Sequence, residues 1–399
     1  MSKNKKLRVL FVSQSFPPDD KPLANVGGMQ RVSVGLHKAL SARADIELDS
    51  LVLKSSWRWH NYITIFWLWQ TLWRIRRKAL RGDFDVVLFS SMVTGAMATP
   101  LRPFLAARGI KMAAIAHGRD VTRGGLYQPV MVKPAIKALD LILPVSTATG
   151  DACRARGCPN EKIEVVPNGI NAAPAALSSD RRASRAANLR RFYQEGPALD
   201  DDALLLCSVG RQVPRKGFAW FVDEVMPNLP DNVHYWLAGQ GPEGPAIASA
   251  VERRGLHGRV RMLGRVSDDA LSALYRSADL FIMPNIPIPE DMEGFGIVML
   301  EAGLAGAPAI AARLEGIQDV VTDGENGHLV PCKNAWAFSE AILPYHQNPK
   351  ALEAASQRAI DHTVSTFGWT AVAARYENQL RTLLAPNALT PQTKEERAA

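Results

Sequence analysis

The sequence predicts an α/β protein with two doubly wound domains in tandem, each a parallel sheet covered by helices on both faces. Short apolar runs alternate with longer stretches of helical spacing, such as the one formed by Val32, Leu36 and Leu40. This alternation runs through residues 7–166, stops, and starts again at Leu204. A chain of 399 residues is also too long for one ordinary core, which favours two domains.

The apolar runs place the strands and therefore the domain boundaries. Strands are expected at 7–12, 46–53, 86–89, 112–115, 141–145 and 163–166 in the first domain, and at 204–209, 233–238, 260–263, 280–283, 309–312 and 328–330 in the second. The composition between the two sets turns rich in Ala, Ser and Arg. We therefore expect an N-terminal domain at 1–175, a linker and entry segment at 176–200, a C-terminal domain at 201–366 and a polar tail at 386–399.

Composition narrows the class of protein. Apolar residues make up 47% and charged residues 22%, an ordinary globular composition. The four cysteines form no C-x-x-C pair and have no His partner at metal-ligand spacing, so neither a zinc site nor a disulfide framework is expected. The Lys-rich start lacks the apolar core of a signal peptide, and the apolar segment 59–73 is shorter than the ~20 residues of a spanning helix. A cytoplasmic protein is expected.

Positive charge is concentrated in the first half of the chain. Residues 1–170 hold 25 Lys and Arg against 12 Asp and Glu, a net charge of +13, whereas residues 171–399 hold 22 against 27, a net charge of −5. A basic half suits nucleic acid, an anionic membrane or a phosphorylated acceptor, and charge alone does not choose among them.

Candidate binding residues follow the predicted strands, because open parallel sheets bind ligands beyond the carboxyl ends of their strands. Gly27 and Gly28 precede the first helix, where a diphosphate or sugar could approach the backbone and the helix N–H groups. Arg211 and Lys216 follow the first strand of the second domain and could neutralise a diphosphate. The alternatives are a simple turn for the glycines and a solvated basic loop for the cations.

Two carboxylates lie on either side of a predicted helix start in the second domain. Glu293 precedes the helix, and Glu301 lies about two turns into it. The amides of Gly294, Phe295 and Gly296 between them could hold a diphosphate, with one carboxylate beside a hexose hydroxyl and the other beside ribose hydroxyls. Alternatively, the negative charge of Glu293 could simply stabilise the helix through its interaction with the helix macrodipole.

Taken together, these segments resemble the retaining glycosyltransferases of GT-B fold, in particular family 4 (glycosyl transferases group 1), over nearly the whole chain. The resemblance implies two Rossmann-like domains facing a central cleft, with a last helix at about 367–385 that packs back on the first domain. The motifs that carry it occur in the family's order: Gly27-Gly28, His117-Gly118, Val166-Pro167-Asn168-Gly169-Ile170, Val209-Gly210-Arg211 with Lys216-Gly217, Leu263-Gly264-Arg265-Val266, Tyr275-Arg276-Ser277-Ala278-Asp279, the segment from Glu293 to Glu301 with Ala302, Gly306 and Pro308, and Asp323-Gly324-Glu325-Asn326-Gly327.

The resemblance implies a hexosyltransferase (EC 2.4) that takes a hexosyl group from a UDP-sugar or GDP-mannose with retention, using neither a metal nor a cofactor. The acceptor would be a saccharide or a lipid-linked saccharide in the synthesis of cell-envelope glycans or polysaccharides. The catalytic set would be Glu293, His117, Arg211 and Lys216; the donor would be held by Gly27, Gly28, Arg211, Lys216, Arg265, Val266, Gly294, Phe295, Gly296 and Glu301.

Each residue has an implied role. Arg211 and Lys216 would hold the diphosphate, Glu293 would orient the sugar, and Glu301 would bind the ribose. The loop at Arg265-Val266 would contact the base through its backbone, and His117 would lie on the acceptor-domain side of the sugar. Three departures from the family pattern leave the identity of the sugar open: Asn171, Leu314-Glu315-Gly316 and Gln318-Asp319.

Other functions fit parts of the sequence. A catalytically silent nucleotide-sugar-binding protein could keep the same fold, and a phosphorylase or epimerase could use the same cleft, although a phosphorylase would need a lysine for a pyridoxal cofactor. Nucleic-acid binding is not expected, because aromatic and basic residues interleave only at 57–81.

That segment, 54–81, allows two interpretations. Five tryptophans, Trp57, Trp59, Trp67, Trp69 and Trp73, are followed by Arg74, Arg76, Arg77, Lys78 and Arg81. The segment could be a core helix whose last-turn cations suit its macrodipole. We instead expect it to mediate peripheral contact with an anionic membrane, at the inner face of the cytoplasmic membrane, because Trp favours the interface and basic residues favour anionic lipid.

Overall fold

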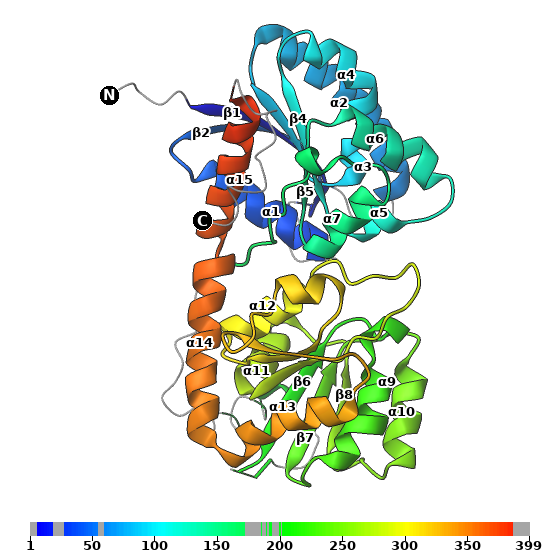
Figure 1. Cartoon of the computed structure of the whole chain (residues 1–399), viewed down its shortest axis with the longest axis vertical. Coiled ribbons are helices and arrows are strands. Elements are labelled where there is room, and N and C mark those ends of the chain that lie inside the picture. The colour runs from blue at the N-terminus through cyan, green and yellow to red at the C-terminus, as the bar shows by residue number, and fades with distance from the viewer. Residues whose placement is uncertain are drawn as a thin grey trace. The chain divides into compact units, whose positions relative to one another are not determined.

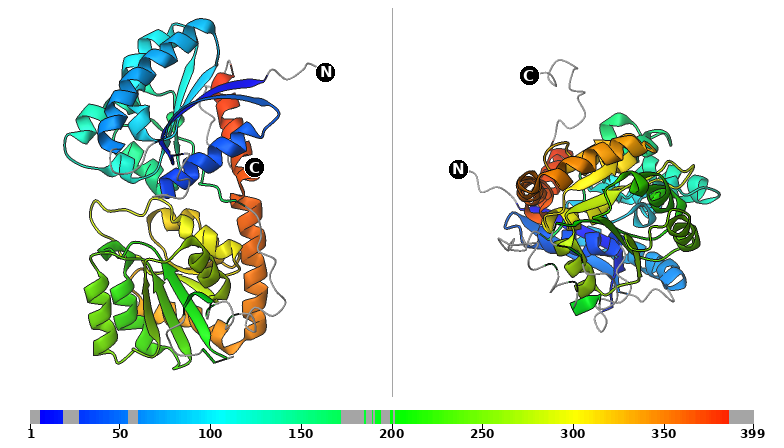
Figure 2. Two further views of the ribbon diagram at one scale, coloured as in Figure 1. Left: turned by 180° about the vertical axis from the view of Figure 1, so that it is seen from behind. Right: turned by 90° about the horizontal axis from the view of Figure 1, so that it is seen from below.

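The computed structural model describes residues 6–18, 28–54, 60–171 and 202–385, together with 185, 189, 191–193, 199 and 200. Contacts divide the chain into two compact units: unit 1 is Met1–Gly169 with Trp369–Ala399, and unit 2 is Ile170–Gly368. Each unit contains one parallel sheet with helices on both sides (Figures 1 and 2). Gly27, most of the expected linker at 176–200 and the expected tail at 386–399 lie outside the described residues.

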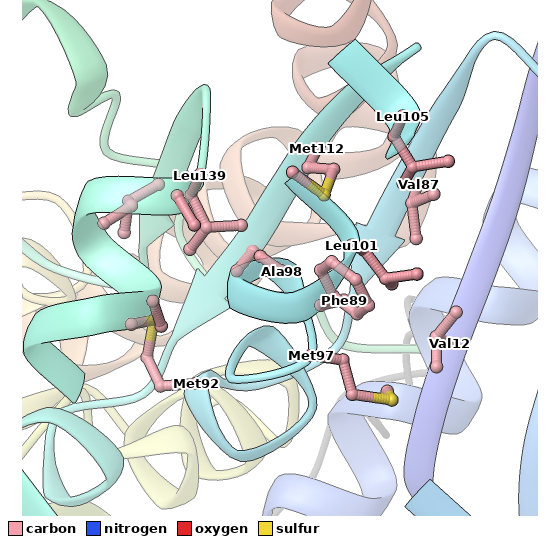
Figure 3. Close-up of a cluster of buried hydrophobic side chains, with 14 of the residues drawn as sticks. Val12, Val87, Phe89, Met92, Met97, Ala98, Leu101, Leu105, Met112 and Leu139 are labelled. Atoms are coloured by element: carbon pink, nitrogen blue, oxygen red, sulfur yellow. The ribbon is translucent and has the colours of Figure 1, made fainter. Parts of the chain in front are cut away.

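The sheet of unit 1 has its five parallel strands in the order β2-β1-β3-β4-β5. Its middle strands are buried and almost entirely apolar, because helices cover both faces. Val87 and Phe89 of β3 and Met112 of β4 meet Leu101 and Leu105 of α4 in a closely packed core (Figure 3). The elements are β1 (Leu7–Phe16), α1 (Gly28–Ser41), β2 (Ile46–Lys54), α2 (His60–Arg81), β3 (Val86–Phe89), α3 (Met92–Gly95), α4 (Ala98–Ala106), β4 (Lys111–Ala116), α5 (Arg119–Thr122), η2 (Gln128–Val132), α6 (Lys133–Ala138), β5 (Leu141–Pro144), α7 (Thr147–Arg154) and η3 (Asn160–Lys162).

The strand predicted at 163–166 is wrong. Ile163 forms only an isolated bridge to Ile142 of β5. The N–H groups of Glu164 and Val166 donate to carbonyls of β5 at 3.1 and 2.9 Å, so the segment runs extended beside the sheet. Pro167, which has no N–H, follows at once, and no regular strand develops from so short an apolar run.

The sheet of unit 2 has six parallel strands in the order β11-β10-β9-β6-β7-β8. From β6 the chain moves outward in one direction through β7 and β8, and from β9 in the opposite direction through β10 and β11. The order therefore reverses between β6 and β9, the position at which such sheets bind ligands. The elements are β6 (Leu204–Val209), η4 (Pro214–Lys216), α9 (Phe218–Trp220), η5 (Phe221–Val225), η6 (Met226–Asn228), β7 (Val233–Ala238), α10 (Gly244–Arg253), β8 (Val260–Gly264), α11 (Asp268–Ser277), β9 (Leu280–Met283), α12 (Ile297–Leu304), β10 (Ala309–Ala312), η7 (Glu315–Asp319), β11 (Gly327–Val330), α13 (Ala335–Gln347) and α14 (Pro349–Phe367).

The last helix, α15 (Trp369–Leu384), belongs to unit 1 and packs on α1. Its first residue sets the fit, because the indole of Trp369 lies against two glycines. A Cβ added at Gly35 of α1 would lie 2.4 Å from this ring, and so would a Cβ added at Gly169. Arg43 and Glu377 form an ion pair between the residues just after α1 and the middle of α15. The two helices therefore meet as closely as the absence of these Cβ atoms permits.

We expect Gly169→Ala to lower the free energy of unfolding by about 1–3 kcal/mol, the usual cost of an extra methyl group in a filled core. The added carbon would push into the Trp369 ring, which two segments hold in place. Gly124→Ala is the matched control, because a Cβ there would have no neighbour within 4 Å. Denaturant unfolding followed by circular dichroism measures both variants. Equal stability of the two would show that the ring moves aside freely.

Candidate active site

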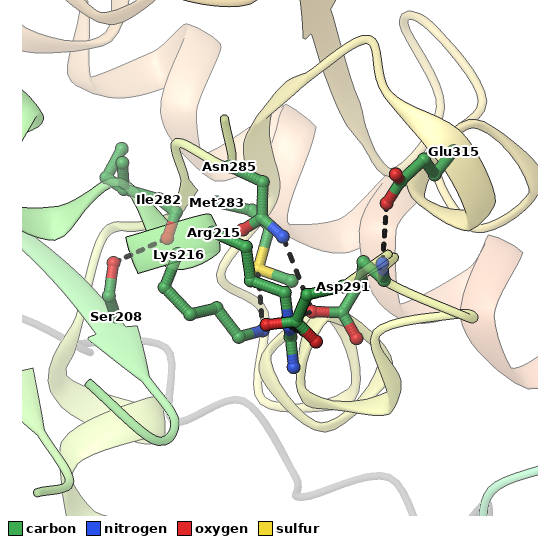
Figure 4. Close-up of polar contacts among 9 residues, drawn as sticks. Ser208, Arg215, Lys216, Ile282, Met283, Asn285, Asp291 and Glu315 are labelled. Atoms are coloured by element: carbon green, nitrogen blue, oxygen red, sulfur yellow. Dashed lines mark hydrogen bonds and ion pairs between the residues drawn. The ribbon is translucent and has the colours of Figure 1, made fainter. Parts of the chain in front are cut away.

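The reversal of strand order in unit 2 brings two loops together. The loop after β6 contains Arg211, Arg215 and Lys216, and the loop after β9 runs from Pro284 to Gly296. Near the ends of these strands the hydroxyl of Ser208 donates a hydrogen bond to the carbonyl of Ile282 (Figure 4). Side chains that are distant in sequence therefore meet at one edge of the sheet.

A glycine lets the two loops come into contact. Gly217 has a φ of 66°, in the left-handed region, and a Cβ there would lie 2.0 Å from the carbonyl oxygen of Pro284. Any other residue would separate the loop after β6 from the loop after β9. In the Lys-Gly pair at 216–217, the glycine thus supplies the backbone conformation that brings the lysine against the loop after β9.

The carboxylate of Glu293 lies at the centre of the contact. Its Oε2 atom accepts a hydrogen bond from Nζ of Lys216 at 2.6 Å and another from Nη1 of Arg215. Nδ2 of Asn285 approaches the same oxygen at 3.4 Å. Arg215 also pairs with a second carboxylate, because Oδ1 of Asp291 lies 3.3 Å from its Nε atom (Figure 4). We call these five residues the Glu293 cluster.

The charge state of the Glu293 cluster follows from burial and pairing. Burial raises the pKa of the Glu293 carboxyl, but the Lys216 and Arg215 cations outweigh that effect and hold it at about 2. Burial lowers the pKa of the Lys216 ammonium, an effect that the Glu293 carboxylate opposes. Glu293 is therefore ionised at neutral pH although its side chain is almost entirely enclosed.

Arg211 lies apart from the Glu293 cluster. It comes two residues after the end of β6 and is exposed, and no other described residue forms an ion pair or hydrogen bond with its side chain. Lys216 is buried and already holds Glu293. The two residues expected to act as a pair thus differ, since one guanidinium is open to solvent and one ammonium is enclosed.

The start of α12 has the layout that the sequence predicts. Gly296 caps the helix with a φ of 88°, and no side chain caps it. Glu301 lies in the second turn and accepts a hydrogen bond at 2.9 Å from the hydroxyl of Tyr275. Phe295 is a core residue whose ring packs against Phe367, so only its backbone is available to a ligand.

Glu315 has a role that the sequence did not reveal. Its carboxylate accepts a hydrogen bond from the backbone N–H of Glu293 at 2.5 Å, and its φ of 46° is rare for a residue with a side chain. The next residue, Gly316, donates its N–H to the carbonyl of Glu293 at 3.1 Å and leaves no room for a Cβ beside Gly294. Burial and the nearby Glu293 charge raise the pKa of Glu315, although the hydrogen bond opposes them. Both backbone groups of Glu293 are therefore fixed by the 315–316 turn.

The remaining donor-site candidates lie further along the same edge of the sheet. Arg265 and Val266 follow β8, which ends at Gly264 with a φ of 65°. The carbonyl of Gly264 accepts a hydrogen bond from Gly239 N–H at 2.7 Å, which ties the end of β8 to the end of β7. Arg265 is exposed and Val266 is half-buried.

His117 lies in unit 1, just after β4. Its Nε2 atom is 2.8 Å from the carbonyl oxygen of Ser90, which can only accept, so Nε2 carries the hydrogen. Its backbone N–H donates to the buried carboxylate of Asp120, whose other oxygen accepts from Met92 N–H at the start of α3. The sequence reasoning missed Ser90 and Asp120. Gly28 is exposed at the first position of α1.

Two family profiles match the chain. The family described as "Glycosyl transferases group 1" matches residues 203–348, and the one described as "Glycosyltransferase Family 4" matches residues 26–173. A phosphatidyl-myo-inositol mannosyltransferase of Mycobacterium leprae is 30% identical over 313 residues, covering 76% of this chain and 74% of that protein. A putative colanic acid biosynthesis glycosyltransferase, WcaL, of Salmonella typhimurium is 26% identical over 306 residues, covering 75% and 71%. The chain belongs to glycosyltransferase family 4.

Solved structures confirm the fold class. HepE of Anabaena in complex with UDP superposes with a TM-score of 0.71 at 17% identity and covers 94% of this chain and 100% of that one. Sucrose-phosphate synthase of Thermosynechococcus elongatus gives 0.69 at 21% identity and covers 95% and 99%. The two parallel Rossmann-like units are those of the GT-B fold.

We expect the stabilising effect of the Glu293 charge to depend on pH. The folded-state pKa is about 2 against an ordinary 4.5, so the ionised group stabilises the fold fully above about pH 4.5, and this contribution is lost as the pH falls through about 2. The difference in melting temperature between the wild type and Glu293→Gln should therefore be largest near neutrality and shrink below about pH 4.5. Thermal melts across that range measure it. A difference that stays constant with pH would mean that the pKa of Glu293 is not depressed.

Proposed function

We propose that this glycosyltransferase takes a hexosyl group from a nucleotide-diphosphate sugar, a UDP-sugar or GDP-mannose, and transfers it with retention and without a metal ion. The observation that supports this most is the Glu293 cluster, in which an ionised carboxylate pairs with the buried Lys216 and the half-buried Arg215 at the strand reversal of unit 2. Such a site offers groups for a sugar hydroxyl and for a diphosphate side by side. Relatives named for mannosyl transfer to phosphatidyl-myo-inositol and for colanic acid synthesis support a saccharide or lipid-linked acceptor in cell-envelope glycan synthesis.

The diphosphate is proposed to bind between the loop after β6 and the start of α12. The amides of Gly294, Phe295 and Gly296 precede a helix that no side chain caps, and the N-terminal end of a helix favours anions. Arg211 is exposed in the loop after β6, and we propose that it turns toward the diphosphate. Lys216 has three N–H donors, so it can hold Glu293 and still share its charge with a phosphate oxygen.

Glu293 is proposed to orient the transferred sugar. Lys216, Arg215 and Asn285 all reach its Oε2 atom, and none of these three engages Oε1. That second oxygen can accept a hydrogen bond from a sugar hydroxyl while the cations keep the group ionised. Glu301, held by Tyr275, is proposed to accept from the ribose hydroxyls.

The other candidates are assigned to the rest of the substrates. Arg265 and Val266 are proposed to meet the base through their backbone groups, and Gly27 and Gly28 to let the donor approach α1. With the hydrogen of the neutral imidazole on Nε2, the Nδ1 atom of His117 can accept a hydrogen bond from a hydroxyl of the sugar or the acceptor.

In the proposed reaction the bond between the anomeric carbon and the leaving phosphate oxygen breaks while the acceptor oxygen bonds to the same face of that carbon. The acceptor proton passes to the leaving phosphate oxygen. Until that proton arrives, the breaking bond leaves additional negative charge on the diphosphate, and Arg211 and Lys216 stabilise this charge. The product keeps the anomeric configuration of the donor.

The direct test is a panel of UDP-, GDP- and ADP-sugars. One donor should raise the melting temperature by mass action and should be hydrolysed or transferred at a rate that EDTA leaves unchanged. Proton NMR should show a product with the donor's anomeric configuration. Loss of turnover in EDTA would contradict metal independence, and the opposite anomer would contradict retention. Donor binding without any turnover would support the alternative, a catalytically silent nucleotide-sugar-binding protein.

Substitutions separate the proposed roles. Arg211→Ala and Lys216→Ala should each lower kcat/KM by about 100-fold or more, because each removes a preorganised contact to the leaving group. Glu293→Gln should chiefly lower kcat, and Glu301→Gln should chiefly raise the KM for the donor.

Arg254→Ala is the control for this series, because this exposed arginine of unit 2 pairs with Asp223 and lies outside the Glu293 cluster. Circular dichroism shows which variants are folded, and only those are compared kinetically. Full activity of folded Arg211→Ala or Lys216→Ala would remove these residues from the donor site. Identical kinetic defects in the two glutamate variants would show that their roles are misassigned.

A further inference from the structure

One face of α2 is exposed although it is strongly apolar. Its exposed large side chains include Phe66, Trp69 and Trp73, which are 61%, 71% and 61% accessible. Ile63 and Leu80 continue the row at either end. The spacing of three, three, four and seven residues keeps these side chains on one side of the helix. Five exposed apolar side chains on a single helix form a patch of a kind that soluble surfaces seldom show.

The opposite face of α2 already forms its part of the core. Trp67, Ile75 and Ala79 are buried in the hydrophobic cluster that the helix shares with the sheet of unit 1, and Thr71 is fully buried beside them. The interpretation of segment 54–81 as a core helix therefore holds for only one face of α2. Packing among the described residues of unit 1 does not explain the outer row.

Positive charge predominates around this row, and two nearby carboxylates, Asp49 and Asp140, are paired with Lys78 of α2 and Arg102 of α4. The helices α2, α4 and α6 and the short π-helix η2 contain no Asp or Glu, and α4 contacts both α2 and α6. Arg74 and Arg81 are exposed on α2, and Arg77 lies over the Trp73 ring with its guanidinium carbon 5.3 Å from the ring centroid. Lys133 and Lys137 continue the basic surface on α6.

We propose that this outer face of α2, with its exposed apolar row and its arginines, docks on the surface of an anionic lipid bilayer. The inference extends the proposed function, since it places the lipid-linked or membrane-proximal acceptor within reach of unit 1. No helix in the described part of the chain is long and apolar enough to cross a membrane, so α2 would lie along the interface. There the tryptophan rings reach the acyl boundary while the arginines meet lipid phosphates.

Charge argues against the main protein alternative. A second copy of this chain would bring together two faces that each carry an excess of positive charge, and like charges repel. A nucleic acid would satisfy the arginines but would not bury the apolar row. An anionic bilayer satisfies both.

The test is flotation of the full-length protein with vesicles of phosphatidylcholine alone and of phosphatidylcholine mixed equally with phosphatidylglycerol. The wild type should bind the anionic vesicles at low salt at least about tenfold more tightly than the neutral ones, and high salt should reduce this difference. Trp69→Ala/Trp73→Ala should weaken binding by about tenfold, and Arg74→Glu/Arg81→Glu by at least as much.

Trp336→Ala is the matched control, because this tryptophan is 68% exposed on α13 of unit 2, outside the proposed surface. It should bind vesicles like the wild type. The proposal is overturned by a wild type that stays free of anionic vesicles at low salt, by a Trp69→Ala/Trp73→Ala protein that binds as the wild type does, or by random RNA or DNA that binds more tightly than the vesicles and competes with them.

Donor-induced stabilisation of the same proteins separates this proposal from the proposed function. Trp69→Ala/Trp73→Ala should keep the donor-dependent rise in melting temperature, since the Glu293 cluster belongs to unit 2. Retained vesicle binding with no donor response in the wild type would refute the donor site alone. A retained donor response without vesicle binding would refute the membrane surface alone.

Discussion

The candidate site of unit 2 depends on one buried charge. A carboxylate enclosed as fully as that of Glu293 is costly unless cations neutralise it, and Lys216 and Arg215 do so from the loop after β6. This pairing joins the two loops that the strand reversal brings side by side. Gly217 and Gly316 are required for the same reason, because the backbones around Glu293 approach more closely than a Cβ would allow. The proposed donor site thus lies at a buried carboxylate whose charge the fold must neutralise whether or not a donor is bound.

The features that the sequence predicted well are those with a local pattern. Buried parallel strands appear as continuous apolar runs, so nearly all were placed, and 163–166 failed because a short apolar run followed by proline does not specify a ladder. Arg215 and Glu315 were missed because their bonds to Glu293 join residues 78 and 22 positions apart. Glu315 was noted only as a departure from a glycine pair, and nothing local to it indicates that its carboxylate anchors the backbone of Glu293.

Helix α2 shows a different limit of sequence reasoning. Apolar residues occur on several of its sides, so periodicity could not decide between a core helix and a surface helix. The folded chain divides the tryptophans, with Trp67 in the core and Trp69 and Trp73 outside. The excess positive charge of the first 170 residues is carried in part by helices without a single carboxylate. Composition predicted the sign of this charge, and only the packing shows on which surface it gathers.

Unit 1 is discontinuous in sequence, since it consists of the first 169 residues and the segment that begins at Trp369. During synthesis all of unit 2 leaves the ribosome before α15 does. The second unit along the chain is continuous and can complete its core first, whereas the first must wait with α1 uncovered around Gly35. N-terminal domains usually fold first, but here the last step in folding unit 1, the packing of α15 on α1, follows the synthesis of all of unit 2. A nascent chain that stops short of Trp369 would expose the surface of α1 around Gly35 to chaperones and proteases.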